Sequence, residues 1–518
     1  MMKKKALCLL LCLCCAIGLS GCTGRKDSGT DEAPATLPPA AVSYKAPDGE
    51  FMPGRGENFN LYLPGKDGLT PVPVTLESMP LNETLRALVE ELLRYEGSGT
   101  VRGLGDTAEG RIELTLYGEN PVEFSSGVCT VNLGPSARQL KHQEFYTAAL
   151  SLAATLCELD EIRWVNVLVA DMSVGLDITG NQAMGSVSSH LDENLTVLWE
   201  QMEAKRAPLG QDVSRYALTS YMTLYFPLTD GRGIACENRN LTFSGQTPEQ
   251  MTRGILDAMS DGSNFLFGVP QMPDILNDLL LYDPLTSEGE NGGRQVTLIF
   301  RENTEQLLEG TGVDMACLLA AITYSLTTYI PGVPEVCVRI GDKPITQLNS
   351  ERFGRTAVLG GLLRRSTLEP YLAGLTKVYF ARDGLLTSCE KAVDRKLTDS
   401  PTEVLKALME GPEKTDSDYG VRATLPPGLG EEDILGISSE GDTLIVNLNE
   451  NFRAEIQSMG KDAEMLLCYS LVNTLCENTG MSRVCFFFEG EQVEYIAGEI
   501  YWAGEFLYNT GLCEQSFG

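Results

Sequence analysis

Histidine, cysteine and paired carboxylates are the residue types in this chain that could do chemistry. Histidine supplies most general bases and many metal ligands, and the sequence holds only His142 and His190. His142 is expected at a helix start and His190 between domains, so neither is assigned to catalysis. With 71 acidic residues, accidental carboxylate pairs are certain, so their number alone does not indicate a glycosidase. We therefore expect no catalytic site, no metal site and no cofactor.

Ten cysteines lie beyond position 22, and none of them forms a Cys-x-x-Cys motif. Cys468 and Cys476 share one predicted helix, roughly 12 Å apart along its axis, which is too far for a disulfide. Buried free thiols are the favoured interpretation. Disulfides, which an exported protein could form, stay open as an alternative. The ten are Cys129, Cys157, Cys236, Cys317, Cys337, Cys389, Cys468, Cys476, Cys485 and Cys513.

Cys22 differs from the others because of what precedes it. Three lysines and an apolar run from Ala6 to Ser20 are typical of an export signal, and the run is too short for an ordinary membrane-spanning helix. Leu19-Ser20-Gly21-Cys22 resembles the bacterial lipobox, in which the cysteine sulfur receives a diacylglyceryl group. We expect residues 1–21 to be a lipoprotein signal peptide. Lipidated Cys22 would then anchor the chain at the extracytoplasmic face of the cell membrane.

Composition and charge bound the rest of the chain. Residues 22–57 are rich in Pro and Ala, lack apolar periodicity and predict a flexible tether. The remainder, in a chain that is 43% hydrophobic and 21% charged, has the composition of folded protein. At about 150 residues a domain, 518 residues suggest roughly three domains. The formal charge of −31 would repel phosphate backbones, so nucleic acid is not an expected partner.

The chain after the tether contains a threefold repeat. Each copy opens with an aromatic strand: Leu61-Tyr62-Leu63, Leu224-Tyr225-Phe226 and Val378-Tyr379-Phe380. A helix with apolar residues at helical spacing follows, then two strands, a second helix and a closing apolar strand. The tetrapeptide Thr155-Leu156-Cys157-Glu158 recurs as Thr474-Leu475-Cys476-Glu477, so the register holds across copies.

The order β-α-β-β-α-β predicts an α+β fold of three tandem domains, each with two helices on one face of a small sheet. The predicted domains are 58–215, 216–370 and 371–518. The paired strands are expected at 113–117 with 129–133, 278–282 with 295–300, and 433–438 with 443–449. The second helices are expected at 148–158, 315–330 and 463–477, and the closing strands at 164–169, 336–340 and 484–488.

The third copy resembles the GerMN domain of sporulation and spore-germination lipoproteins. The resemblance rests on Val378-Tyr379-Phe380, Leu408-Met409-Glu410-Gly411-Pro412, Leu425-Pro426-Pro427-Gly428 and Val446-Asn447-Leu448-Asn449, with Pro331-Gly332-Val333 in the middle copy. It implies a non-enzymatic, membrane-anchored protein that acts in sporulation or spore germination by contacting other envelope proteins. Self-assembly is a further hypothesis.

The aromatic C-terminal segment allows two interpretations. Tyr495, Tyr501, Trp502, Phe506 and Tyr508 could form a closing hairpin on the third domain or a partner-docking surface. The competing function for the whole chain is an envelope solute-binding or hydrolytic lipoprotein that uses clefts between domains. An acid-lined cleft at a domain boundary would favour that alternative.

Overall fold

The computed structural model describes residues 57–514, except 67, 78–80, 160, 178–179, 265, 267, 290–292, 395–397, 399, 413–415, 418 and 499. The predicted signal peptide, Cys22 and the predicted tether before Glu57 lie outside the described residues. The described residues all belong to one compact unit, Ser43–Gly518. In this described part, no helix has the length and apolar character needed to span a membrane.

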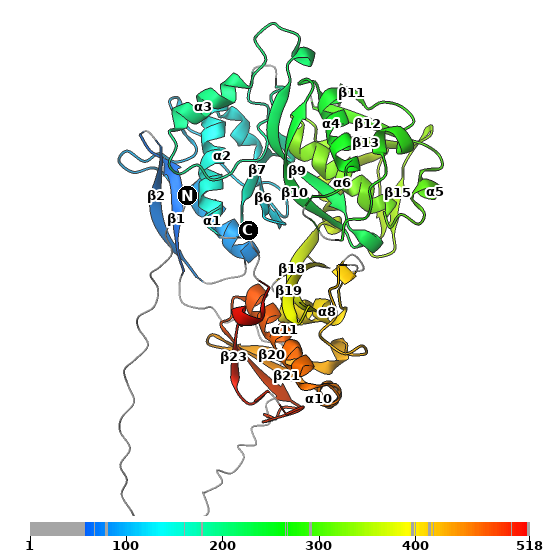
Figure 1. Cartoon of the computed structure of the whole chain (residues 1–518). Helices are drawn as coiled ribbons and strands as arrows, with labels where there is room; N and C mark the ends of the chain where they lie inside the picture. The colour runs from blue at the N-terminus through cyan, green and yellow to red at the C-terminus, as the bar shows by residue number, and fades with distance from the viewer. Residues whose placement is uncertain are drawn as a thin grey trace, which may run out of the picture. The chain divides into compact units, whose positions relative to one another are not determined.

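The first region begins with an antiparallel hairpin and continues into a four-stranded sheet of order β5-β6-β7-β8, in which β6 and β7 are parallel (Figure 1). Two helices, α1 and α2, pack on one another, and they contact strands β5 and β7 of this sheet, respectively. Its elements are β1 (Glu57–Pro64), β2 (Leu69–Leu76), α1 (Leu81–Arg94), β3 (Asp106–Thr107), β4 (Gly110–Arg111), β5 (Val122–Ser125), β6 (Val128–Leu133), α2 (His142–Leu156), β7 (Trp164–Val169), β8 (Met172–Ser173) and α3 (Leu195–Ala204).

The second region repeats this plan, with β11-β12-β13-β14 as its sheet and β17 also paired with β13. Its elements are β9 (Leu218–Pro227), β10 (Ile234–Phe243), α4 (Pro248–Ser260), β11 (Leu285–Glu288), β12 (Arg294–Phe300), α5 (Thr304–Leu308), α6 (Met315–Tyr329), β13 (Glu335–Ile340), β14 (Lys343–Pro344), β15 (Gln347–Ser350), β16 (Gly354–Ala357), β17 (Leu362–Arg364) and α7 (Arg365–Leu368).

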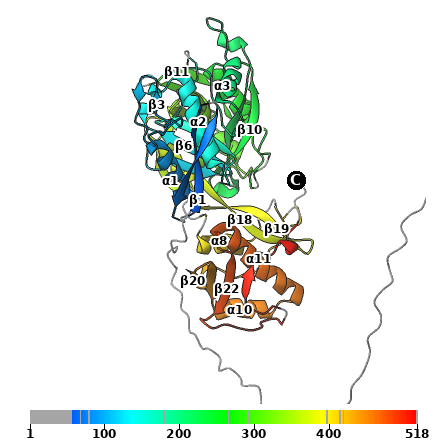
Figure 2. The ribbon, with the colours of Figure 1, turned by 90° about the vertical axis from the view of Figure 1, so that its left-hand side faces the viewer.

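The third region has the sheet β20-β21-β22-β23, and Figure 2 shows α8 and α11 beside its hairpin β18–β19. Its elements are β18 (Ala373–Arg382), β19 (Leu385–Asp394), α8 (Pro401–Met409), β20 (Ile434–Glu440), β21 (Thr443–Leu448), α10 (Glu450–Gln457), α11 (Lys461–Thr479), β22 (Arg483–Phe488) and β23 (Glu505–Leu507). Short one-turn helices connect elements at Pro135–Gln139, Val213–Arg215, Thr229–Gly231, Ile275–Leu279, Glu369–Tyr371, Glu431–Asp433 and Thr510–Leu512.

Two features of the predicted strand order were wrong. Each opening strand pairs with a strand directly after it, as β1 does with β2, so a hairpin precedes the first helix in place of a single strand. In the first two regions, residues 113–117 and 278–282 are not the sheet strands. Each touches its neighbour through one isolated bridge, and the strands are instead β5 and β11, which come later in the chain. The closing strands and the second helices lie within three residues of their predicted bounds, except that α2 begins earlier, at His142.

One hydrogen bond recurs in all three regions and ties each hairpin to the second helix. The backbone N–H of Tyr62 donates to Thr155 Oγ1 at 2.9 Å, and the N–H of Tyr379 donates to Thr474 Oγ1 at 2.9 Å. In the middle region, Tyr225 N–H donates to Ser325 Oγ, also at 2.9 Å. The outer N–H of an edge strand needs a partner when it is buried, and the helix hydroxyl supplies it.

Alternation of side chains gives each sheet two distinct faces. In the first sheet, Val131 and Val167 lie in the core that the region builds with its own helices. The alternate residues of the same strands, including Val128 and Asn166, face the other way and are also buried. The third sheet likewise turns Val446 and its alternates into its own core. The second face of the first sheet is therefore covered by another part of the chain, and Val128 lies in the core cluster of the second region.

Candidate interaction surfaces and pockets

The aromatic C-terminal segment does not form one surface. Trp502 is fully buried and packs edge-on against Phe486, with ring centroids 5.3 Å apart. Phe506 is buried in the same core because β23 pairs with β22 as a closing hairpin. Tyr495 and Tyr501 are 56% and 50% exposed and form a T-shaped pair. Burial thus removes Trp502 and Phe506 from the predicted docking surface, whereas Tyr495 and Tyr501 remain on the outside.

Tyr508, the fifth of these residues, lies over the opening tyrosine of its own region. Its hydroxyl is 2.6 Å from the hydroxyl of Tyr379, which also lies 3.4 Å from a carboxylate oxygen of Glu477. Burial, together with the hydrogen bond to Tyr508, raises the pKa of Tyr379. Burial also raises the pKa of Tyr508, to about 12. Both phenols therefore stay protonated at neutral pH, and they serve as hydrogen-bonding groups rather than as bases.

Arg365 holds the equivalent position in the middle region. It lies two residues after Leu363, which pairs with Val336, just as Tyr508 lies two residues after the strand partner of Val484. Its guanidinium packs 4.1 Å from the ring centroid of Tyr324 and is 4% exposed. The carboxylate that it meets belongs to the first region: Arg365 Nη2 is 2.5 Å from Glu123 Oε2. Arg365 is also hydrogen-bonded to Tyr225, the opening tyrosine of this region, which therefore lies under the contact between Arg365 and Glu123 of the first region.

A buried polar network continues this contact between the first two regions. Asn166 Nδ2 donates to Thr223 Oγ1 at 2.9 Å, and Ser186 Oγ donates to Asn166 Oδ1 at 2.8 Å. Trp164 stacks on Tyr221 with ring centroids 4.6 Å apart. The second face of the first sheet thus packs on the outer face of hairpin β9–β10, and Figure 1 shows β6 and β7 beside these strands.

The third region touches the second through a smaller contact that consists mainly of apolar side chains. Leu228, Ala235 and Ala373 form a separate cluster, with Leu375 and Ala392 packed against it. At its edge, Arg232 and Glu410 form an ion pair of 3.2 Å whose carboxylate side chain is 53% exposed. Such an exposed pair contributes at most about 1 kcal/mol. The two junctions therefore differ in chemistry: one contains buried polar groups and the other mainly small apolar side chains.

Comparison with known proteins assigns the third region to a family. Residues 377–494 match the Germane family model, described as sporulation and spore germination. This match confirms the resemblance predicted from the motifs of the third copy. The number of copies stays a prediction, because the match lies within one region. No curated protein matches the chain.

The solved structures that are similar to the chain include the following two. The tandem GerMN domains of the sporulation protein GerM from Bacillus subtilis are 17% identical, with a TM-score of 0.22, over 58% of this chain and 96% of that one. A putative lipoprotein from Clostridium perfringens is 18% identical, with a TM-score of 0.18, over 26% of this chain and 87% of that one.

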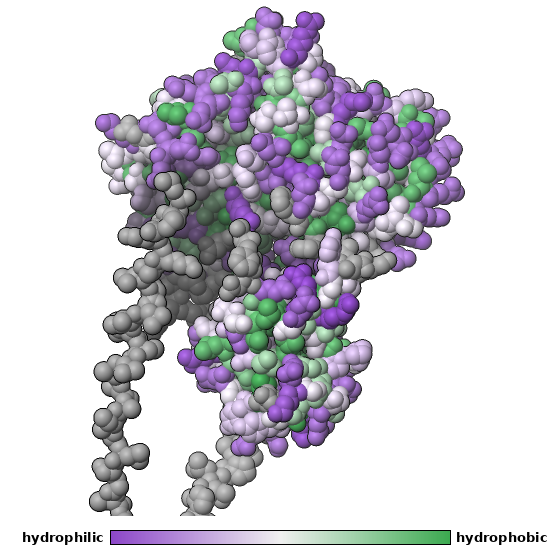
Figure 3. All heavy atoms as spheres, in the orientation of Figure 1, coloured by the Kyte–Doolittle hydropathy of each residue, from purple (hydrophilic) through white to green (hydrophobic). Residues whose placement is uncertain are grey.

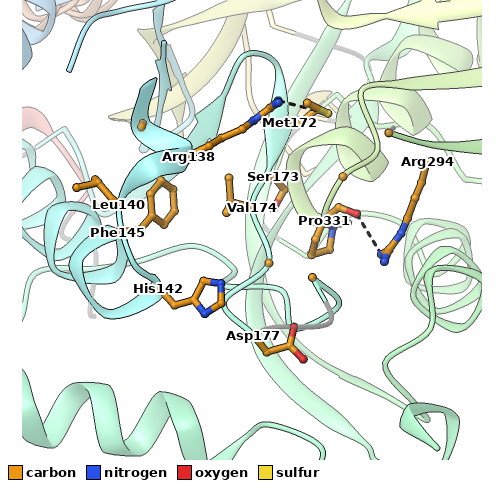
Figure 4. Close-up of a pocket in the computed structure, with 15 residues that line it drawn as sticks. Arg138, Leu140, His142, Phe145, Met172, Ser173, Val174, Asp177, Arg294 and Pro331 are labelled. Carbon is orange, nitrogen blue, oxygen red and sulfur yellow. Dashed lines mark hydrogen bonds between the residues drawn. The ribbon is translucent and has the colours of Figure 1, made fainter. Parts of the chain in front are cut away.

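A pocket lies between the first two regions, outside the Germane segment. Its volume is about 480 Å³, and it is lined by the loop around Arg138, by Asp177 and by residues near Arg294. Figure 4 shows the two arginines directed to different acceptors: Arg138 to Met172 and Arg294 to the carbonyl of Pro331. Asp177 accepts backbone N–H bonds from residues 181 and 182. This pocket is lined by more cationic than acidic side chains, so it is not the acid-lined cleft that would favour the alternative function.

The smaller pocket is acidic, with a volume of about 100 Å³ beside the Arg365–Glu123 pair. Burial raises the pKa of Asp171 in its wall, although Asn132 Nδ2 donates to Asp171 Oδ1 at 2.7 Å. A carboxyl with a raised pKa is a feature of acid catalysts. The cavity is, however, well below the volume of about 300 Å³ at which ligand pockets usually begin.

The histidines and thiols lie in ordinary structural settings. His142 is the first residue of α2, as predicted, and His190 Nδ1 lies 2.7 Å from Glu193. All ten cysteines of the described chain are free thiols, and six of them are buried. Burial raises the pKa of Cys157 and Cys476 to about 11, so these thiols stay protonated and weakly nucleophilic. Among the described residues, no group of three or more metal-ligating side chains converges.

Sequence reasoning missed the residues that join the first two regions. Glu123, Asn166, Thr223 and Arg365 were not singled out, although they carry the buried contacts of that junction. One signal was present: Thr130 and Asn132 occupy alternate positions of an otherwise apolar strand, and Asn166 lies in the next apolar strand. Polar residues at alternate positions normally mark a solvated face. Here they mark a face that another region covers.

Proposed function

We propose that this chain is a lipid-anchored, extracytoplasmic protein that acts without catalysis, as an interaction or assembly component of sporulation or spore germination. The single observation that carries the proposal is the Germane match at residues 377–494. The sequence around Cys22 supplies the anchor in this proposal, and residues 22–57 supply the tether. Its partners would be other envelope or sporulation proteins, with the membrane reached through the lipidated cysteine.

The proposed body consists of three GerMN-like domains at 58–215, 216–370 and 371–518. The support is the hydrogen bond from an opening-strand tyrosine to a hydroxyl of the second helix, which has the same length in all three. Three unrelated segments would have no reason to share this contact. Each domain is expected to present one sheet face and one hairpin face to its neighbours, because two-layer folds bury only one side of each element.

The test is crosslinking and capture of the tagged full-length protein from membranes of growing and sporulating cells. Recovery of envelope proteins mainly from sporulating cells is the expected result. Recovery of sugars, peptides or transporter subunits from growing cells would contradict it. Cys22→Ser provides the matched control for the anchor: the variant should leave the membrane fraction after a high-salt wash. A variant that still sediments with membranes would show that another segment anchors the chain.

A second candidate, a hydrolytic or solute-binding lipoprotein, has one observation in its favour. Asp171 has a raised pKa in an acidic pocket at the boundary of two regions, and a larger pocket with Arg138 and Arg294 lies between the same regions. Thermal unfolding of the protein with cell-wall glycan fragments or phosphate distinguishes the two functions, because a ligand of the folded state raises Tm. This candidate predicts a Tm increase that Arg138→Ala and Arg294→Ala abolish. Unchanged Tm values would contradict this second candidate and leave only the interaction role.

A further inference from the structure

The pocket around Arg138 is built by both of the first two regions. Arg138 lies on the one-turn helix Pro135–Gln139 of the first region, whereas Arg294 begins β12 of the second. The backbone N–H of Gly332 donates to the carbonyl of Ser173 at 2.9 Å, so a direct hydrogen bond joins the two walls. A ligand in this pocket would therefore contact both regions at once.

Neither guanidinium in this wall has a carboxylate partner within the part of the chain that the structure describes. Arg138 Nη2 lies 3.5 Å from the carbonyl of Val169 and 3.9 Å from the sulfur of Met172. Arg294 Nη1 lies 3.5 Å from the carbonyl of Pro331. These acceptors are neutral, and the distances are at the outer limit for a hydrogen bond. Because a guanidinium carries five N–H donors, both side chains retain donors for a ligand.

Asp177 is the one carboxylate among the described residues that line this pocket. It is 5% exposed, and its Oδ1 accepts the backbone N–H groups of Asn181 and Gln182 at 2.9 and 3.1 Å. Figure 4 shows its carboxylate away from both guanidinium groups. With two guanidinium groups against one carboxylate, the wall carries a net positive charge in a chain whose formal charge is −31.

The rest of the wall bounds the size and the character of a ligand. The volume of about 480 Å³ is within the range of about 300–1,000 Å³ that is usual for small-molecule sites. Leu140, Phe145 and Pro331 add buried apolar groups to the wall. On the face that Figure 3 shows, hydrophilic residues predominate over the first two regions, and the hydrophobic residues scattered among them mark no docking face. The pocket is thus suited to a small organic anion.

We propose that this pocket binds a small dianion whose two oxyanion groups bridge Arg138 of the first region and Arg294 of the second. Carboxylate and phosphate groups both offer several acceptor oxygens, which a guanidinium binds through two parallel hydrogen bonds. The proposal adds a ligand class to the second candidate function and rests on it in that respect, but it is independent of the interaction role. Because each end of the ligand binds a different region, the bound dianion also stabilises the junction.

The experiment is isothermal titration calorimetry of the purified full-length protein in detergent. One arm uses straight-chain dicarboxylates from malonate to pimelate, each compared with the monocarboxylate of the same carbon number, such as pentanoate for glutarate. The other arm compares pyrophosphate with phosphate, so the two arms distinguish the two kinds of oxyanion. In at least one arm, a dianion should bind about tenfold or more tightly than its matched monoanion, because only the dianion pairs with both arginines. Dianions that bind no better than their monoanions, or no binding in either arm, would overturn the proposal.

Matched variants locate the bound dianion. Arg138→Gln and Arg294→Gln should each weaken its binding by about tenfold or more, since each removes one charge-assisted pair. Arg355→Gln removes the same charge from an exposed arginine of β16 that does not line the pocket, and it should leave the affinity unchanged. Equal losses in all three variants would mean that the ligand responds to overall charge, which would contradict the bridged site. Circular dichroism melting without ligand checks that each variant is folded.

Hydrogen exchange followed by mass spectrometry tests the bridge itself. The Gly332 amide donates across the junction to Ser173, so a peptide that contains Gly332 should exchange more slowly when the dianion is bound. A peptide that contains Tyr379 of the third region is the control and should exchange at an unchanged rate. Unchanged exchange at Gly332 would show that the ligand does not hold the two regions together.

The outcomes separate the bridged site from the second candidate function. A Tm increase with phosphate that both arginine variants abolish, without any preference for dianions, would refute the bridge and leave that function standing. Dianion binding at both arginines, with unchanged Tm values in glycan fragments and phosphate, would support the bridge and refute the second candidate.

Discussion

The opening tyrosines of the second and third regions have the same backbone hydrogen bond but different covers. Tyr225 is buried under a neighbouring region through Arg365 and Glu123, whereas Tyr379 is covered by Tyr508 from its own region. A buried charge pair costs desolvation that only good geometry offsets, whereas a tyrosine pair carries no such cost. The difference teaches that one structural position can join two regions or close a single one, depending on its side chain.

The comparison predicts the largest effect at Arg365. Arg365→Met leaves the Glu123 carboxylate, which is 14% exposed, without its guanidinium partner. We expect the free energy of unfolding to fall by about 3–5 kcal/mol, measured by denaturant titration. Tyr508→Phe is the matched control in the third region and should cost about 1 kcal/mol or less, since it removes one neutral hydrogen bond.

The double variant Glu123→Gln/Arg365→Met distinguishes the cost of leaving the Glu123 charge unpaired from the cost of removing the Arg365 side chain. It should recover part of the stability that Arg365→Met alone loses, because no unpaired charge remains. Equal stability of the single and double variants would mean that Glu123 is solvated and that the pair does not join the regions.

A smaller effect is expected in the network between the regions. Asn166→Ala removes a hydrogen bond from each of Thr223 and Ser186, two buried residues whose hydroxyls then keep their mutual contact at 3.1 Å. Loss of these buried hydrogen bonds should cost about 1–3 kcal/mol, which thermal unfolding would detect. Cys485→Ala at the same register position of the third sheet is the control and should be close to neutral, because it shortens a small, partly buried side chain by one sulfur atom.

How much of this could be predicted from the sequence depends on the range of the interactions involved. The closing strands and second helices were predicted nearly to their ends, because long apolar runs and caps are local signals. β2 was missed because Pro71 and Pro73 argue against a strand. Prolines are tolerated there because, within the described part of the chain, β2 pairs with β1 along one edge only. β11 was missed because its residues are largely exposed and lack apolar alternation.

The candidate site was less predictable than the fold. The aromatic tail was identified as a segment, but its composition does not say which rings point inward, and Trp502 and Phe506 do. The junction of Arg365 with Glu123 spans 242 positions, and no local pattern encodes a contact at that separation. Cys22 was predicted from the most local signal of all and lies outside the described residues.

The recurring hydroxyl should contribute a moderate and similar amount in the two outer regions. Thr155→Val and Thr474→Val each remove the acceptor of a tyrosine N–H while keeping the side-chain shape. A loss of about 1 kcal/mol is expected in each case from the unsatisfied donor. Hydrogen exchange of the Tyr62 and Tyr379 amides, followed by mass spectrometry, should become faster in the matching variant only. Protection that is unchanged would mean that the helix does not hold the strand edge.

The smallest effect concerns pH at hairpin β18–β19. Burial raises the pKa of Glu390 above its ordinary value of 4.5, although Lys377 and Arg163 act in the opposite direction. As the pH falls, Glu390 therefore takes up a proton at a higher pH in the folded protein than in the unfolded one. The stability that the protonated Glu390 contributes is fully present below pH 4.5 and is lost as pH rises through the folded pKa. Glu390→Gln should be more stable than the parent at pH 7, with the difference shrinking in acid. Denaturant midpoints at both pH values provide the measurement.

The three hairpins carry similar sequences in one chain, and this has a consequence for how the protein reaches its native state. Strands of tandem repeats can exchange partners during folding, which is a common route to misassembly. Here every opening strand finds its partner within its own hairpin, as Glu57–Pro64 does with Leu69–Leu76. Contacts of such short sequence separation form early, so each hairpin can close before the next copy has been synthesised. Local pairing thus keeps three interchangeable strands from being interchanged.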